Sequence, residues 1–106
     1  MTFGSIKQTT DGKNSKYLWD CKYTDKKYYT LTANTWKKVL DEANKEYREP
    51  LLFIRLISDD YVVEMKSFRP KISNKKSQRI YGECLIVLAG NKIEYELEVK
   101  KIEDFL

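Results

Sequence analysis

The run from Leu51 to Ile57, Leu-Leu-Phe-Ile-Arg-Leu-Ile, constrains the fold of this chain more than any other stretch. Apolar residues occupy the odd and the even positions of the run alike, so both faces of a strand here would be apolar. This is typical of a central strand buried on both faces. A helix is predicted just before it, capped by Thr32 or Asn34 and ended by Pro50. The helix has an apolar stripe that suits it to cover a sheet, formed by Trp36, Val39, Leu40, Ala43 and Tyr47.

Further strands are predicted on either side of this helix and strand. Residues 3–9 and 15–23 are expected to form a hairpin around Asp11-Gly12, a strong turn signal, which puts Ser5 opposite Asp20. The basic segment 68–78 has no periodicity and is predicted to be a mobile loop. The other predicted pieces are a short extended piece at 28–31, a strand at 61–66, a hairpin of 79–88 with 92–100 around Ala89-Gly90-Asn91, and a short docked turn at 102–106.

This order of elements predicts an α+β or α/β fold in a single domain of residues 1–106. We expect a mixed β-sheet of about five to six strands with one main amphipathic helix packed on it. The hairpin of 79–88 with 92–100 is expected to add to that core at the C-terminal end.

The composition limits the chemistry that the chain can perform. There is no histidine and there are two cysteines, Cys21 and Cys84. A histidine base, a Ser-His-Asp triad and a Cys/His zinc site are therefore excluded. Both cysteines lie in apolar runs and are predicted to be buried thiols rather than a disulfide. Any hydrolytic chemistry must use carboxylates, lysine and a hard metal ion.

The charge and hydropathy patterns bear on partners and compartment. A net charge of +4 favours an anionic partner, and 16 lysines against four arginines suit contact with phosphates better than base reading. No window approaches the ~20 apolar residues of a membrane span. Residues 1–5 show no charged segment leading into an apolar one. We therefore expect a cytoplasmic protein with no membrane partner.

The strand predicted around residues 17–24 carries Asp20 and Lys22, which leave it on the same face. A carboxylate that holds a hard cation, beside a lysine near a phosphate, is what metal-assisted phosphodiester cleavage needs. The spacing alone is weak evidence, because about 2.4 acid-x-lysine pairs are expected by chance. Asp20 and Lys22 stand out by the lysine-rich loop, helix and buried strand that follow them. The five pairs in the chain are Asp11/Lys13, Asp20/Lys22, Asp25/Lys27, Glu64/Lys66 and Glu98/Lys100.

Several stretches together resemble one protein family. They are residues 18–27 (Leu-Trp-Asp-Cys-Lys-Tyr-Thr-Asp-Lys-Lys), residues 29–31, the helix around Trp36, residues 48–55 and residues 60–63. They are similar to the core of the PD-(D/E)xK nucleases, in particular the phage and archaeal Holliday-junction-resolvase branch. The resemblance spans about residues 4 to 68 and implies a restriction-endonuclease-like core.

The resemblance also implies site residues, a cofactor and partners. Asp20 takes the role of metal-binding acid, Lys22 that of catalytic lysine, and Cys21 lends its backbone carbonyl to the metal. The implied cofactor is Mg²⁺ or Mn²⁺, the implied substrate is branched or duplex DNA, and a homodimer follows from the twofold action of family resolvases. Phosphate contacts are expected from Lys13, Lys16, Lys26, Lys27, Lys71, Lys75 and Lys76.

Two departures from the family pattern weaken the implied metal site. The family's other metal-binding acid lies on the preceding strand, where the matching residue is Ser5, a poor anchor for Mg²⁺. The predicted hairpin puts Asp11 in its turn, up to about 20 Å from Ser5 along the strand at ~3.3 Å per residue. The family's N-terminal helix, which supplies a further acid, has no counterpart before the first predicted strand.

Three interpretations remain open at this point. The first is a Mg²⁺-dependent, junction-resolving endonuclease, in which Asp20 binds the metal and Lys22 positions or deprotonates water. The second is a nuclease-like fold without a competent site that binds DNA or a protein partner, as small phage inhibitors and accessory factors do; its compartment would be the host cytoplasm. The third is a small α/β domain in which Asp20 and Lys22 form a surface ion pair worth ~0–1 kcal/mol.

Overall fold

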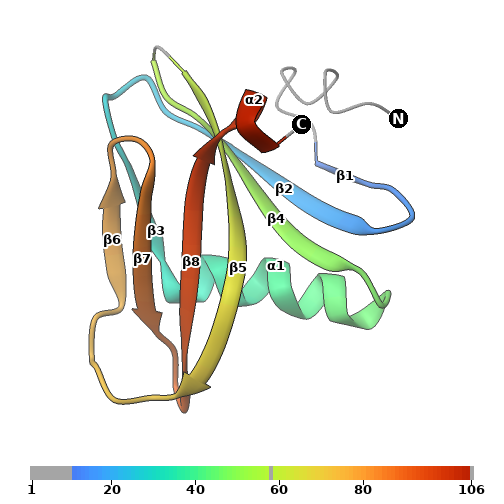
Figure 1. Cartoon of the computed structure of the whole chain (residues 1–106), viewed down its shortest axis with the longest axis vertical. Coiled ribbons are helices and arrows are strands. Elements are labelled where there is room, and N and C mark those ends of the chain that lie inside the picture. Colours follow the sequence, from blue (N-terminus) through green and yellow to red (C-terminus); the bar gives the residue numbers. More distant parts are fainter. Residues whose placement is uncertain (1–10, 58, 106) are drawn as a thin grey trace.

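The computed structural model describes residues 11–57 and 59–105. Figure 1 shows a strongly twisted sheet with one long helix across one face and a short helix at the end of the last strand. The elements in chain order are β1 (Gly12–Lys13), β2 (Tyr17–Tyr23), β3 (Tyr29–Thr32), α1 (Ala33–Lys45), β4 (Glu49–Arg55), β5 (Asp60–Pro70), β6 (Ser77–Ile80), β7 (Cys84–Ala89), β8 (Ile93–Lys101) and α2 (Ile102–Phe105).

The main sheet has six strands in the order β1-β2-β4-β5-β8-β7, and β3 pairs with β6 in a second, small sheet. Strands β2 and β4 are parallel, and the chain crosses between them through β3 and α1. The other neighbouring pairs of the main sheet are antiparallel. The predicted mixed sheet with one main helix packed on it is confirmed.

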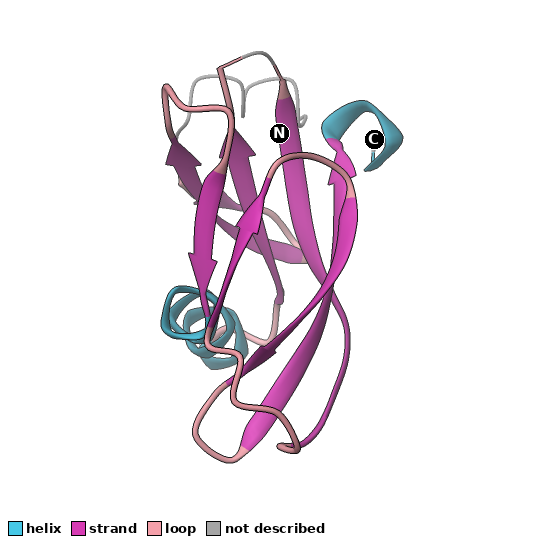
Figure 2. Cartoon of the chain, turned by 90° about the vertical axis from the view of Figure 1, so that its left-hand side faces the viewer, coloured by secondary structure: helices cyan, strands magenta, loops and turns pink. Residues whose placement is uncertain are grey.

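Two hydrophobic clusters lie on opposite faces of the sheet. On β4, Leu52 and Ile54 point into the cluster beneath α1, while Leu51 and Phe53 point into the cluster that also holds Ile102 of α2. Figure 2 shows the two helices on opposite sides of the strands. The prediction of a central strand buried on both faces is therefore confirmed for Leu51 to Ile54, but the strand ends at Arg55 and Ile57 is 66% exposed. No helix in the described part of the chain is long and apolar enough to cross a membrane.

Helix α1 begins where its sequence predicts and ends earlier. The N-cap is Thr32, whose Oγ1 accepts a hydrogen bond from the Thr35 N–H at 3.1 Å. The helix ends at Lys45, and Tyr47 has a φ of 57° with a side chain that is 97% exposed. The prediction that Tyr47 belongs to the buried stripe and that Pro50 ends the helix is wrong, because the chain turns in the left-handed region before it reaches the proline.

The C-terminal half departs from the predicted second hairpin. Residues 79–88 are not one strand, since β6 pairs with β3 and the next strand, β7, begins at Cys84. Strand β8 pairs with β7 on one side and with β5 on the other. This hairpin therefore completes the main sheet and does not stand apart from it.

The basic segment between β5 and β6 is a loop over residues 71–76, shorter than predicted. The Glu94 side chain is 1% exposed and accepts hydrogen bonds from Arg69 Nε at 2.7 Å and from the Ser73 hydroxyl at 2.8 Å. The residues 68–70 belong to β5. The prediction of a loop over 68–78 is therefore confirmed for residues 71–76 and wrong for 68–70 and 77–78, which belong to strands. Its backbone forms three hydrogen bonds with neighbouring segments. The Lys71 N–H donates to the Lys92 carbonyl, and the carbonyls of Lys75 and Lys76 accept from the N–H groups of Ala89 and Ala33.

The first described hairpin turns three residues later than predicted. Gly12 lies opposite Trp19 and Lys13 opposite Leu18, so this register puts Asp11 level with Asp20. The turn is built by Asn14, whose Oδ1 accepts from the N–H groups of Lys16 and Tyr17 at 2.9 and 2.8 Å. The predicted turn at Asp11-Gly12 is wrong, because Asn14 supplies a side-chain turn of its own. Residues 3–9, Ser5 included, lie outside the described residues.

Gly12 is required at its position by the indole of Trp19. A Cβ on Gly12 would lie 2.8 Å from Trp19 Cζ2 and 3.0 Å from Cε2. The indole is 2% exposed and packs edge-on against Phe53 at 6.0 Å, so it has no room to move. Gly12 therefore serves the packing of β1 on β2, and not a hairpin turn.

Replacing Gly12 by alanine is expected to lower the free energy of unfolding by about 1–3 kcal/mol, the usual range for overpacking. Urea denaturation measures this loss. The matched control is Gly82→Ala, whose Cβ would meet Tyr61 Oη at 3.5 Å, an ordinary contact. An equal loss in both variants would mean that helix and strand propensity, and not the indole, sets the effect.

Candidate functional site

Two carboxylates meet at the edge of the sheet. The Cys21 N–H donates to Asp11 Oδ1 at 2.8 Å and to Asp20 Oδ1 at 2.9 Å. Asp11 directly precedes β1 and Asp20 lies on β2, so the register of the hairpin brings the two acids together. The prediction that Asp11 is too distant to join Asp20 is wrong, and its cause is the misplaced turn.

The pKa values of the two acids move in opposite directions because their carboxyl groups interact. The pKa of Asp11 is raised, first by a hydrogen bond with Asp20 and then by burial and the negative charge of Asp20. Burial works to raise the pKa of Asp20, but hydrogen bonds with Asp11 and Lys22 and the charge of Lys22 lower it overall. Two carboxylates held this close repel each other when both are ionised, and a bound cation would relieve that repulsion.

Lys22 lies beside the two acids on the same face of β2. Its Nζ is 3.2 Å from Asp20 Oδ2. Burial works to lower the pKa of Lys22, but the hydrogen bond with Asp20 and its negative charge raise it overall. Lys22 is therefore a cation at neutral pH, which suits it to hold a phosphate or orient water and not to act as a base.

Two further groups complete the surroundings of the site. The charges of Lys22 and Asp20 both act on the Tyr29 hydroxyl, whose pKa is raised chiefly by burial. Burial, then the charges of Asp11 and Asp20, raise the pKa of the Cys21 thiol to about 12. Cys21 and Cys84 form no disulfide with each other, as predicted, but both side chains are half-buried and not fully buried. The Cys21 side chain is therefore inert as a nucleophile, and its proposed carbonyl contact to a metal stays a prediction.

The donor set suits a hard divalent cation held in part by the protein. Mg²⁺ is usually bound through one or two carboxylates together with water and substrate phosphate oxygens. Asp11 and Asp20 supply two carboxylates. No group of three or more His, Cys, Asp or Glu side chains able to hold a metal occurs within residues 11–57 and 59–105. The site fits a weakly held Mg²⁺ or Mn²⁺ and does not fit zinc.

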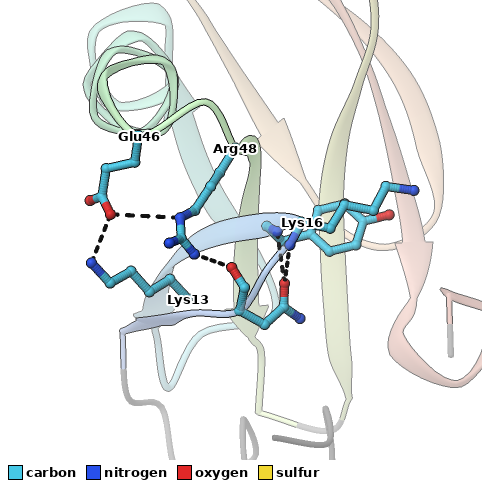
Figure 3. A network of polar contacts seen from close by, with 6 residues as sticks. Lys13, Lys16, Glu46 and Arg48 are labelled. Carbon is cyan, nitrogen blue, oxygen red and sulfur yellow. Dashed lines mark hydrogen bonds and ion pairs between the residues drawn. The ribbon is translucent and has the colours of Figure 1, made fainter.

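Lys13 and Lys16 lie at the turn end of the hairpin, where they form ion pairs. Lys13 Nζ donates to Glu46 Oε1 at 2.7 Å, and Lys16 Nζ lies 3.6 Å from Glu49 Oε2. Figure 3 shows Lys16 and the pair of Lys13 with Glu46, together with Arg48, which also joins Glu46 and the backbone of the turn. These two lysines fasten the hairpin to the end of α1 and the start of β4, which gives them a structural role whether or not they contact DNA.

The other predicted phosphate contacts fall into two places. Lys26 and Lys27 are exposed in the loop that follows the strand of Asp20 and Lys22, and neither forms an ion pair with any described residue. Lys71 and Lys76 line a separate cavity of about 460 Å³ at the start of α1, none of whose lining residues belongs to the acid pair. Lys75 is exposed beside Lys76. The lysines predicted to contact phosphates therefore do not form one surface. Of these lysines, only Lys26 and Lys27 lie in the loop that directly follows β2, the strand of Asp20.

Comparison of the chain with protein-family models, with curated proteins and with solved structures finds no match in any of the three.

Proposed function

We propose that this chain is a metal-dependent nuclease whose site consists of Asp11, Asp20 and Lys22. The observation that carries the proposal is the single Cys21 N–H that donates to both carboxylates, with Lys22 Nζ 3.2 Å from Asp20. Three groups of the required kinds are thereby assembled from two strands of one hairpin. The second acid, which the resemblance to the PD-(D/E)xK nucleases demands and Ser5 does not supply, is present as Asp11.

The reaction is the hydrolysis of a phosphodiester. The oxygen of a water molecule bonds to phosphorus and gives up a proton to solvent, one P–O ester bond breaks, and the leaving oxygen takes up a proton from solvent to give a hydroxyl and a phosphate monoester. Asp11 and Asp20 would hold the cation, and the Lys22 ammonium would donate to a non-bridging phosphate oxygen as charge accumulates there. A bound divalent cation supplies Lewis-acid polarisation of the phosphate and lowers the pKa of water.

The substrate we propose is DNA, with a four-way junction as the first form to test. The support is the resemblance to junction resolvases, the net charge of +4 and the unpaired Lys26 and Lys27 beside the site. Lysines bind phosphates as point charges and read no sequence, so we expect recognition of DNA form and not of base order.

The test is cleavage of a labelled four-way junction, a duplex and a single strand during a Mg²⁺ and Mn²⁺ titration. Wild type is expected to cut, and Asp20→Ala is expected to lose the activity while keeping its thermal unfolding transition. Absence of any product at every metal concentration would overturn the proposal. If the protein then still bound the junction in a salt-sensitive way, it would be a binding protein with a nuclease-like fold. If it did not bind the junction either, Asp20 and Lys22 would be interpreted as a surface ion pair without a function in DNA binding.

A further inference from the structure

An aromatic and cationic cluster lies on the outer face of the small sheet. It consists of Tyr28, Arg79 and Tyr81, and we call it the tyrosine–arginine cluster. The rings of Tyr28 and Tyr81 are 5.5 Å apart and tilted by 46°, and the guanidinium of Arg79 lies 4.5 Å from the centre of the Tyr28 ring. Lys26 Nζ approaches the same ring to 5.7 Å.

The pairing of β3 with β6 explains why these side chains face outward. Tyr29 lies opposite Ile80, and both contribute to the core beneath α1. Because side chains alternate along a strand, Tyr28 and Tyr81, one step further along, point away from that core. Figure 1 shows β3 and β6 side by side next to β7. The core therefore does not require these two rings, and Tyr81 is 61% exposed.

The cluster and the candidate nuclease site are linked through neighbouring residues of the chain. Tyr28 is followed in the chain by Tyr29, which interacts electrostatically with Lys22 and Asp20. The two segments that form the cluster, residues 25–30 and 77–81, contain Lys26, Lys27 and Arg79 against one acid, Asp25. This surface thus offers one exposed and one half-buried aromatic ring together with an excess of positive charge.

We propose that the tyrosine–arginine cluster is a stacking site for an unpaired nucleobase, with Lys26 and Lys27 holding the adjoining phosphates. This inference rests on the proposed nuclease function and specifies its substrate: DNA with unpaired nucleotides next to the cleaved bond, preferred over a fully paired four-way junction. Aromatic rings and arginine planes bind the faces of unstacked bases, whereas the bases of a duplex are stacked on one another. A partner that offered only negative charge, such as the backbone of a duplex, would bind the lysines and Arg79 but would gain no affinity from the two tyrosine rings.

The experiment measures binding without metal, so that cleavage plays no part. Fluorescence anisotropy in EDTA gives the affinity for a single-stranded oligonucleotide and for its duplex, and 2-aminopurine in the strand reports stacking by its quenching. Tyr28→Leu and Tyr81→Leu are each expected to weaken single-strand binding by about five- to a hundredfold and to restore the fluorescence, while duplex affinity stays unchanged. Tyr28→Phe and Tyr81→Phe keep the ring and are expected to bind like wild type.

The matched control is Tyr47→Leu, an exposed tyrosine beyond the end of α1, which is expected to change neither affinity. Equal weakening of single-strand and duplex binding, or no weakening, overturns the stacking site, and so does a wild type that fails to bind single strands. If the protein cleaves DNA but its single-strand affinity does not depend on Tyr28 and Tyr81, the stacking site is wrong and the nuclease proposal stands. Ring-dependent quenching without cleavage removes the nuclease proposal alone.

Discussion

Asp11→Asn is expected to abolish metal-dependent cleavage, by about a hundredfold or more, and at the same time to stabilise the folded protein. Asparagine keeps an oxygen that can accept from the Cys21 N–H, so the hairpin geometry is preserved. The change removes one of the two carboxylates and with it the repulsion of Asp20. Without divalent cations, the gain at neutral pH is a few tenths to about 1 kcal/mol, because Asp11 is largely exposed and water screens the charge.

The pH dependence of this gain follows from the raised pKa of Asp11. The folded protein holds the Asp11 proton more tightly than the unfolded chain, so stability falls as pH rises past the unfolded-state pKa. The gain from Asp11→Asn is therefore full above the folded-state pKa and disappears at acid pH, where both carboxyl groups are protonated. Thermal unfolding at a series of pH values in EDTA measures it.

Metal binding provides the second measurement on Asp11. Mg²⁺ is expected to raise the unfolding temperature of wild type, by preferential binding to the folded state, and to leave that of Asp11→Asn unchanged. Asp25→Asn is the matched control, because Asp25 and Lys27 have the same acid-x-lysine spacing without a second acid. If Asp25→Asn lost as much activity as Asp11→Asn, a general effect of charge would explain both.

Trp36→Ala is expected to cost about 3–5 kcal/mol of unfolding free energy, the range for removing a fully buried indole. Trp36 is 0% exposed and lies in the cluster between α1 and the sheet. Typical domains have only about 5–15 kcal/mol in all, so this variant is expected to be close to unfolding at room temperature. Urea denaturation at low temperature is the appropriate measurement.

Trp36→Phe separates the volume of the indole from its polar group. The Trp36 Nε1–H has no hydrogen-bond acceptor among the described residues. A buried donor without a partner costs about 1–3 kcal/mol, so its removal offsets part of the lost packing. Trp36→Phe is therefore expected to be far milder than Trp36→Ala. If the two variants lost equal stability, the indole N–H would have to be making a hydrogen bond that the phenyl ring cannot replace.

The elements that depend on hydrophobic periodicity could be predicted from the sequence. The stripe of α1 and the apolar run of β4 determine which faces are buried, and both are confirmed except at their C-terminal ends, where Tyr47 and Ile57 are exposed. The structure of segments that pair with residues far away in the sequence could not be predicted. Strand β6 pairs with β3 across a long separation, and the segment before it is fixed by the buried Glu94 from β8.

The candidate site shows the same division between local and long-range information. Asp20 and Lys22 could be found from spacing and context on one strand. Asp11 could not, because two turn signals competed and Asp11-Gly12 is the stronger one in isolation. The informative residues were Asn14, which can form a turn by itself, and Trp19, which needs a residue without a side chain opposite it. Only the packing of that indole shows that Gly12 belongs to a strand.

Among the described residues, strand β1 spans two residues and pairs with β2 alone at the edge of the main sheet. With so little pairing, we expect it to open at a lower free energy than the whole protein unfolds. The acid pair consequently exists only in the fraction of molecules in which this edge is closed. Under the proposed function, cleavage activity and global folding are therefore two separate equilibria, and warming is expected to abolish activity before the protein unfolds.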